Sequence, residues 1–196
     1  MTPAAIKRDW GASAALGLGI VLFFAMDQRY TLGGPAVTRA EGVVLVAIFA
    51  LSVAATAFGS TKQTRAILIV GGLFFAVSTA IALLRITGMA IYEPAKIDAV
   101  RLLKTALFIW ICNVVAFSVI YDLLGEGQFQ FSKRAGDENV PANFADYLFV
   151  SFTTATAFSP TDTPPLTTRA RMLMMAESSV SLLTIVVAAA RALNML

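Results

Sequence analysis

The stretch that decides the fold lies in the C-terminal half, where residues 143–168 read NFADYLFVSFTTATAFSPTDTPPLTT. Asn143 is a favourable helix N-cap, and the residues that follow it predict a helix that ends near Ala157. This helix is too short and too rich in hydroxyl groups to cross a bilayer, because a span needs about 20 mostly apolar residues. The prolines that follow exclude a continuing helix. Irregular backbone is tolerated at membrane depth only where protein or a water-filled cavity covers it, so this order of elements predicts a re-entrant loop.

Long apolar segments fill most of the remaining chain. Two of them bracket the loop and three precede it; they are Trp10–Met26, Gly42–Phe58, Ala66–Leu84, Thr105–Leu124 and Met172–Ala190. Each has about the length of a spanning helix, and none has the apolar/polar periodicity of a water-facing one. The first has a basic start like that of a signal peptide, but residues 26–29 offer no small-residue cleavage site, which favours a span. We therefore predict an all-α membrane protein with five transmembrane helices plus one re-entrant helix and loop between the last two.

The composition supports residence in the bilayer and excludes several classes of function. Hydrophobic residues make up 58% of the chain and charged residues 14%, whereas soluble domains carry about a quarter charged residues. The net charge of +3 is scattered over short loops and forms no basic stripe for nucleic acid. The chain has no histidine and a single cysteine, Cys112, within an apolar run. We expect no cofactor, no metal site and no enzymatic activity.

The connecting segments give further expectations. Ser60–Arg65 is so short that it can join only two neighbouring antiparallel helices. Arg85–Lys104 contains Pro94 and then several charges, a pattern that predicts an interfacial helix leading into the fourth span. Gly125–Asn143 is the longest polar stretch, and we expect it to form an exposed turret.

The re-entrant segment resembles the pore loop of tetrameric potassium channels. Residues 154–162, TATAFSPTD, align without a gap with Thr-Ala-Thr-Thr-Val-Gly-Tyr-Gly-Asp of a bacterial member of that family. Downstream, Pro165-Leu166-Thr167 and Arg171 fall where the family has Pro-x-Thr and an Arg that opens its inner helix. The resemblance implies a homotetramer in the inner membrane, with residues 105–196 as the pore module and residues 1–104 as a peripheral three-helix bundle with an interfacial segment. The basic residues divide almost equally between the two sides, so only the resemblance gives an orientation, with the N-terminus outside and the C-terminus cytoplasmic.

A second resemblance covers most of the chain and brings no established activity with it. Several stretches are similar to an uncharacterised family of bacterial integral membrane proteins. They include Tyr30-Thr-Leu-Gly, Ile109-Trp-Ile-Cys-Asn-Val and residues 146–153, 155–162 and 178–194.

The filter-like residues depart from the potassium pattern. The loop comprises Thr154, Thr156, Ala157, Phe158, Ser159, Pro160, Thr161 and Asp162. Ser159 and Thr161 stand at glycine positions, Pro160 stands between them, and Ala157 replaces the filter threonine. A ladder of axial carbonyls needs φ values that these residues resist, so potassium selectivity is not expected.

Two interpretations of the loop remain open. Its hydroxyls, with Asp162 as an acidic ring, would line a wider, weakly selective pore for monovalent cations. Alternatively, the Ser and Thr side chains satisfy the freed backbone groups of a broken helix.

The last span carries an acid that also needs an explanation. Glu177 is the only acid well inside a predicted span, where a charge costs a few kcal/mol and usually marks a functional site. It either faces the interior and braces the re-entrant helix, or lines a pathway, or pairs with Arg169 or Arg171. Ser181 falls where the inner helix of potassium channels has its hinge glycine. In the fourth span, we expect Asn113 to bond to a neighbouring helix.

Two functions compete on these grounds. The first is a homotetrameric, cation-preferring pore-loop channel without a potassium-type filter. The repeated arginines of a voltage sensor are missing, so voltage gating is not expected. The alternative is a non-conducting membrane scaffold or small-molecule transporter that keeps a channel-like architecture. A transporter would show paired broken helices, whereas this sequence predicts a single one.

Overall fold

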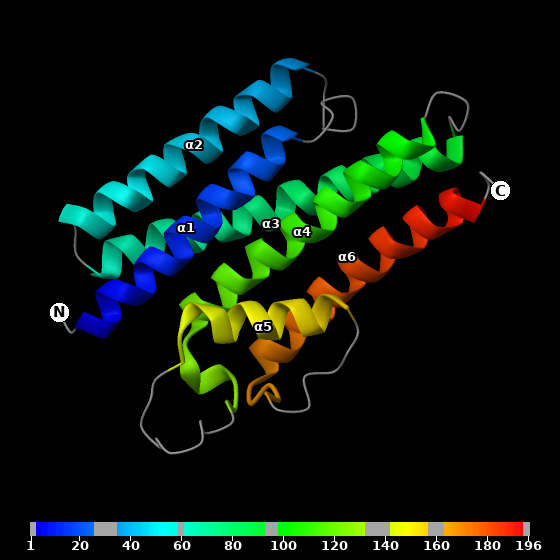
Figure 1. The fold of residues 1–196 in the computed structure, drawn as a ribbon. Coiled ribbons are helices and arrows are strands. Elements are labelled where there is room, and N and C mark those ends of the chain that lie inside the picture. The colour runs from blue at the N-terminus through cyan, green and yellow to red at the C-terminus, as the bar shows by residue number, and fades with distance from the viewer. Residues whose placement is uncertain are drawn as a thin grey trace.

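The computed structural model describes residues 3–25, 35–58, 61–92, 98–131, 142–156 and 163–193. Within these ranges the chain forms six α-helices and one short 3-10 helix (Figure 1). The elements are α1 (Pro3–Ala25), α2 (Pro35–Phe58), α3 (Thr61–Tyr92), α4 (Ala99–Leu124), η3 (Glu126–Gln128), α5 (Phe144–Ala155) and α6 (Thr168–Leu193). The predicted all-α class is therefore confirmed.

Four of these helices are long and apolar enough to cross a membrane. Their apolar segments are Arg39–Phe58, Gln63–Tyr92, Val100–Leu124 and Thr168–Ala190, and α1 contributes a shorter one, Trp10–Ala25. Large apolar side chains cover the outside of the bundle, for example Val43, which is 68% exposed, and Met175, which is 63% exposed. Contiguous apolar surface of this kind is rare on monomeric soluble proteins. The fold is that of a membrane-embedded helical protein.

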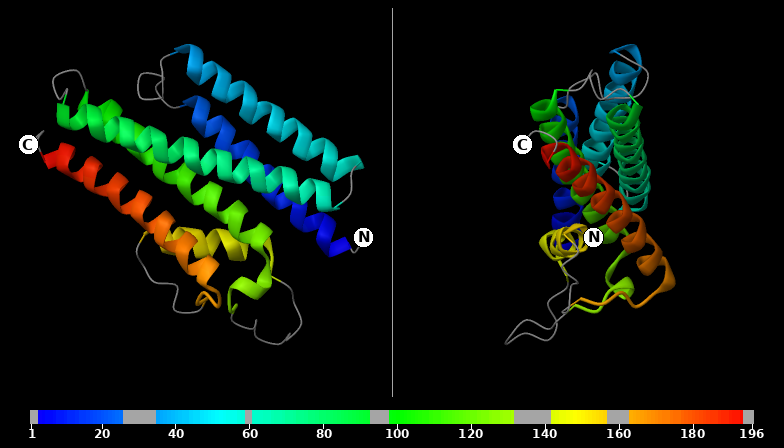
Figure 2. Two further views of the ribbon diagram at one scale, coloured as in Figure 1. Left: turned by 180° about the vertical axis from the view of Figure 1, so that it is seen from behind. Right: turned by 90° about the vertical axis from the view of Figure 1, so that its right-hand side faces the viewer.

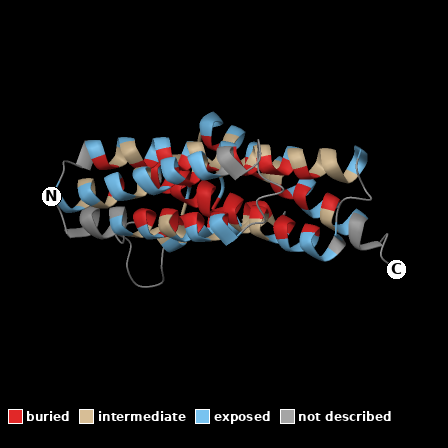
Figure 3. Cartoon of the chain, turned by 90° about the horizontal axis from the view of Figure 1, so that it is seen from above, coloured by how far each residue is buried: buried red, intermediate tan, exposed pale blue. Residues whose placement is uncertain are grey.

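The five long helices lie side by side, and α5 packs along one end of α4 and α6 (Figures 1 and 2). Consecutive long helices run in opposite directions, so that α1 begins at one end of the bundle and α6 ends at the other (Figure 1). The innermost helix is α4, since 72% of its apolar segment is buried against 17% in α2 and in α6. Buried positions face the centre of the bundle and exposed ones face outward (Figure 3). The apolar core is continuous across residue 104, because it joins Leu16 and Phe75 to Leu102 and Ile109.

Glycines on α1 allow three neighbouring helices to approach it closely. Each lies against a phenylalanine side chain: an added Cβ would come within 2.8 Å of the Phe144 Cβ at Gly11, within 2.9 Å of the Phe49 ring at Gly17 and within 2.5 Å of the Phe75 ring at Gly19. Real Cβ atoms essentially never lie under 3.0 Å from such atoms. Small residues thus set the distance between α1 and its neighbours, as they do at many membrane helix interfaces.

The link between α3 and α4 differs from the expected interfacial helix. The α3 helix continues through Arg85 to Tyr92, and Ala99–Lys104 forms the first turns of α4. Packing explains the difference, because Ile86 and Leu102 are both fully buried in the core and extend the two spans toward each other. The described residues of the predicted interfacial segment thus belong to α3 and α4, and residues 93–97 lie outside the described part of the chain.

The start of the polar stretch after α4 is packed, not exposed. Gly125, with φ of 91°, turns the chain sharply out of α4, a conformation that suits glycine. Phe129 is only 2% exposed, and it forms an antiparallel bridge with Pro165. The predicted exposed turret was wrong for this part, because the aromatic side chain is drawn into a core cluster. Residues 132–141 of that prediction lie outside the described part of the chain.

Candidate functional site

The short helix α5 begins at a complete capping box. The side chain of Asn143 accepts hydrogen bonds from the backbone N–H groups of Ala145 at 2.9 Å and Asp146 at 3.3 Å, and Asp146 accepts from the Asn143 N–H at 2.7 Å. This reciprocal arrangement satisfies N–H groups that have no partner inside a helix. The predicted cap at Asn143 is confirmed, and the helix ends at Ala155, two residues before the predicted Ala157.

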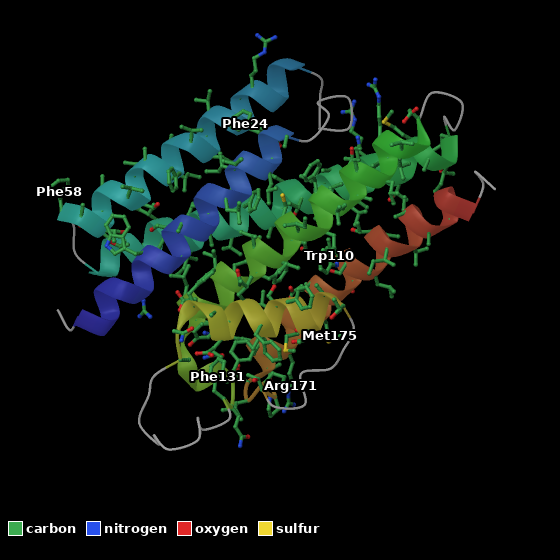
Figure 4. The ribbon with its side chains drawn as sticks, in the orientation of Figure 1. Phe24, Phe58, Trp110, Phe131, Arg171 and Met175 are labelled. Carbon is green, nitrogen blue, oxygen red and sulfur yellow. The ribbon has the colours of Figure 1, made fainter. Side chains whose placement is uncertain are left out.

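Side chains from two spans hold the other end of α5. Trp110 on α4 donates its Nε1–H to the carbonyl oxygen of Ala155 at 3.4 Å, and its ring packs edge-on against Phe152. Ser178 on α6 donates its hydroxyl to the carbonyl oxygen of Thr154 at 3.3 Å. The last carbonyls of a helix lack partners within it, so these two donors fix the end of α5 between the spans. Figure 4 shows Trp110 beside this end of the helix.

The threonine hydroxyls near this end are engaged with their own helix. Thr154 donates to the carbonyl of Val150 at 2.7 Å, and Thr156 donates to the carbonyl of Phe152 at 2.9 Å. Thr153 donates to carbonyls of the same helix. The hydroxyls of these three residues therefore bond back to carbonyls of their own helix. The remaining residues of the filter-like loop, Ala157 to Asp162, lie outside the described residues.

Glu177 lies at the point where α4, α5 and α6 meet. Its side chain has no exposed surface. Tyr121 on α4 hydrogen-bonds to its Oε2 at 2.5 Å, and Ser151 on α5 hydrogen-bonds to its Oε1. The expectation that Glu177 faces the interior is confirmed, and its bond to Ser151 is the one expected of a residue that braces α5.

Neither Arg169 nor Arg171 neutralises this acid. Arg169 and Arg171 are both exposed on the first turn of α6, whereas Glu177 is fully buried one to two turns further on. Figure 4 shows Arg171 at the outer end of α6. The alternative of an ion pair between Glu177 and one of these arginines was therefore wrong.

Asn113 fixes α4 to α6 one turn beyond Glu177. Its Nδ2 donates to the hydroxyl oxygen of Ser181 at 2.9 Å and to the backbone carbonyl oxygen of Glu177 at 3.2 Å. All three residues have no exposed surface. The prediction that Asn113 bonds to a neighbouring helix is confirmed, and Ser181 is its partner.

An aromatic cluster packs α5 against α4 and the segment that follows α4. Tyr121, Phe129, Phe131 and Tyr147 pack edge-on or tilted, with ring centroids 5.1 to 6.4 Å apart. Figure 4 shows Phe131 beneath α5. Backbone hydrogen bonds run from Gln130 N to Pro164 O at 3.0 Å and from Leu166 N to Gln128 O at 2.8 Å. They tie the chain after α4 to the chain before α6.

Tyr121, Ser151 and Phe129 did not emerge from the sequence as site residues. A helical spacing signal was present for one of them, because Asn113 and Tyr121 lie eight residues apart on the same face of α4. Ser151 has no comparable signal, since its role depends on how α5 sits against the other two helices. Phe129 and Phe131 are aromatic residues in a polar stretch, which is itself a sign of packing.

Within the described ranges, no group of three His, Cys, Asp or Glu side chains could hold a metal ion. The arrangement thus offers a buried network of hydroxyl, amide and carboxyl groups that links three helices around the end of α5. Comparison with family models, with curated proteins and with solved structures finds no match for this chain.

Proposed function

We propose that this chain is a pore-loop, channel-like membrane protein that assembles as a homotetramer and conducts monovalent cations without potassium-type selectivity. The observation that carries the proposal is the position of α5. It is a helix of 12 residues, too short to cross a bilayer, and its C-terminal end is held between α4 and α6 by Trp110 and Ser178. Its C-terminal end leads directly into the filter-like loop at residues 157–162.

In this proposal α1 spans the membrane together with the four longer apolar helices, and α5 is the re-entrant helix. The α1 helix has 23 residues, which at 1.5 Å per residue gives a length of about 35 Å. The hydrocarbon core of a bilayer is about 30 Å thick. The protein would lie in the inner membrane. With five spans and the loop outside, its N-terminus lies outside the cell and its C-terminus lies in the cytoplasm.

The preference for cations rests on the charge of the loop. The C-terminal end of a helix carries partial negative charge, and α5 presents this end to the loop. Asp162 adds a carboxylate to each copy, so four copies would form an acidic ring at the mouth of the pore. Because the residues at the glycine positions are Ser159 and Thr161, the ion would interact mainly with side chains and water.

Unpartnered apolar surface on α5 and α6 supports assembly with further copies. Only 17% of the apolar segment of α6 is buried. Exposed side chains on these two helices include Phe149, Phe152, Met172, Leu182 and Val186. In a tetramer these faces would contact neighbouring copies, while the exposed face of α2 would contact lipid.

Native mass spectrometry of the detergent-solubilised protein tests the assembly. A tetramer is expected, and a monomer that persists across mild detergents contradicts the proposal. Efflux of Na⁺, K⁺ and Cl⁻ from proteoliposomes then tests conduction. We expect comparable efflux of the two cations and slower efflux of chloride. A tetramer that releases none of these ions would favour the non-conducting scaffold instead.

A further inference from the structure

Three oxygen–oxygen pairs link α4, α5 and α6 around Glu177. The first joins Tyr121 Oη to Glu177 Oε2 at 2.5 Å, and the second joins Ser151 Oγ to Glu177 Oε1. The third joins the same Ser151 Oγ to the backbone carbonyl oxygen of Val114 at 2.8 Å. The side chains of Tyr121, Ser151 and Glu177 have no exposed surface, so bulk water has no access to the network.

The three pairs need one more hydrogen than the two hydroxyl groups can supply. Each pair needs one hydrogen between its oxygens, because two oxygens without one repel at this distance. The hydroxyls of Tyr121 and Ser151 supply one hydrogen each, and the carbonyl of Val114 supplies none. Three pairs and two hydroxyl hydrogens leave one hydrogen to be supplied by the carboxyl group.

We infer that Glu177 is a proton-binding site and stands in the folded protein as a neutral carboxylic acid. Tyr121 donates to Oε2, the Oε1–H group donates to Ser151 Oγ, and Ser151 donates to the carbonyl of Val114. Each of the three oxygen–oxygen pairs then contains one hydrogen. An ionised carboxylate would take the Ser151 hydrogen and leave two lone-pair oxygens facing each other at Val114. The inference goes beyond the proposed function, because it holds whether or not the chain conducts ions.

The charged and titratable groups around Glu177 are consistent with a neutral acid. On the helices that meet there, the other buried titratable side chains are Cys112, Tyr121 and Asp122 on α4 and Tyr147 on α5, whereas Arg169 and Arg171 on α6 are exposed. The α3 helix, which also packs on α6, has no charged residue between Arg65 and Arg85. Among the described residues, none of these elements places a cation against the carboxyl group. A lone carboxylate would lose its hydration here without compensation, a cost that the neutral acid avoids.

The proton has a structural role in this arrangement. It completes the connection from Glu177 through Ser151 to Val114, and so it fastens α5 to both spans. Removing the proton would break this connection between Ser151 and Val114, because Ser151 would then donate to Glu177, and it would place a negative charge in the interior. We therefore expect deprotonation to loosen α5 from α4.

Infrared difference spectroscopy of the full chain in lipid nanodiscs tests the protonation state directly. At neutral pH the wild type should show the carbonyl band of a protonated carboxylic acid, and Glu177→Gln should remove it. Asp122→Asn is the matched control, since Asp122 is another buried acid, and it should leave the band in place. Ser151→Ala should shift the band, because the acid loses its acceptor. Absence of an acid band that is sensitive to Glu177→Gln would overturn the inference.

The pH dependence of stability gives an independent readout. If Glu177 keeps its proton when folded and loses it when unfolded, the folded state binds one more proton than the unfolded state at neutral pH. Stability must then fall as the pH rises, with the unfolding equilibrium constant increasing up to about tenfold per pH unit. This slope begins above about pH 5, where an unfolded Glu has lost its proton. It ends where the folded protein loses its proton as well.

Glu177→Gln provides the control for this slope. The amide keeps both functions of the neutral acid, an acceptor for Tyr121 and a donor for Ser151, so the variant should fold and lack the slope. Equal pH dependence in the two proteins would contradict the inference. Should the glutamine variant not fold, the band shift between the wild type and Ser151→Ala carries the test, and an unshifted band would overturn it.

Discussion

The Nδ2 atom of Asn113 lies 2.9 Å from the hydroxyl oxygen of Ser181, in a part of the bundle where neither side chain has any exposed surface. The same nitrogen donates to the backbone carbonyl oxygen of Glu177 at 3.2 Å. One amide group therefore joins α4 to α6 at a side chain and at the backbone. This fixes the register of the two helices that carry the walls of the candidate site.

Replacing Asn113 with Leu should destabilise the protein by about 1 kcal/mol. Hydrogen bonds between helices in membranes are worth roughly 0.6 kcal/mol on average and up to about 1.7 kcal/mol, and this substitution removes two of them. Unfolding of the purified protein by a denaturing detergent, followed by circular dichroism, measures the change. Ser179→Ala is the control, because Ser179 is exposed and bonds only to the carbonyl of Met175 in its own helix. If Ser179→Ala lowered stability as much as Asn113→Leu, the stabilising role of the Asn113 hydrogen bonds between α4 and α6 would be contradicted.

Replacing Gly19 with Ala should destabilise the bundle by about 1 to 3 kcal/mol, the usual cost of overpacking a core. The added methyl group would lie 2.5 Å from the ring of Phe75, which is fully buried in the core. Gly88→Ala is the matched control on a neighbouring helix, since nothing lies within 4 Å of a Cβ at that position. There the higher helix propensity of Ala should leave stability equal or slightly increased. Thermal unfolding in detergent compares the two variants, and equal losses in both would refute the packing argument.

The sequence predicts the helical class well because the bilayer imposes a simple rule on length and polarity. Apolar segments such as Thr105–Leu124 must be helical to satisfy their backbone groups in lipid, and Thr105–Leu124 lies within α4. Helix ends follow the same logic less reliably. The charge of Arg85 suggested an end to α3, yet packing of Ile86 in the core carries the helix on to Tyr92.

The candidate site is only partly visible in the sequence. Glu177 and Asn113 stand out because polar groups are costly inside a span. The partners Tyr121 and Ser151 do not stand out, because a tyrosine near the end of a span and a serine in a hydroxyl-rich helix are both ordinary. Their role arises only from the angle at which α5 meets α4 and α6, and that angle depends on packing among three helices.

Replacing Trp110 with Phe should loosen the last turn of α5. The phenyl ring keeps an aromatic contact with Phe152 but removes the hydrogen bond to the carbonyl of Ala155. A bond of this kind is worth about 0.5 to 1.5 kcal/mol, so amide hydrogen exchange in the last turn should accelerate roughly two- to tenfold. Trp10→Phe is the control, because Trp10 is 45% exposed on α1, which approaches α5 at its other end, at Phe144. Unchanged exchange in the Trp110 variant would show that Ser178 alone holds this end of α5.

Replacing Asp162 with Asn tests the charge of the proposed pore directly. In a tetramer the substitution removes four negative charges from the mouth, and the local concentration of cations there should fall, up to about tenfold at low ionic strength. The measurement is the ratio of Na⁺ to Cl⁻ efflux from proteoliposomes, which should decrease. The effect should shrink in high salt, where charges are screened over a few ångströms. Asp137→Asn removes the same charge from the polar stretch after α4 and should leave the ratio unchanged. A fall of equal size in both variants would mean that the ratio reports the overall surface charge, and the acidic ring would then have no support.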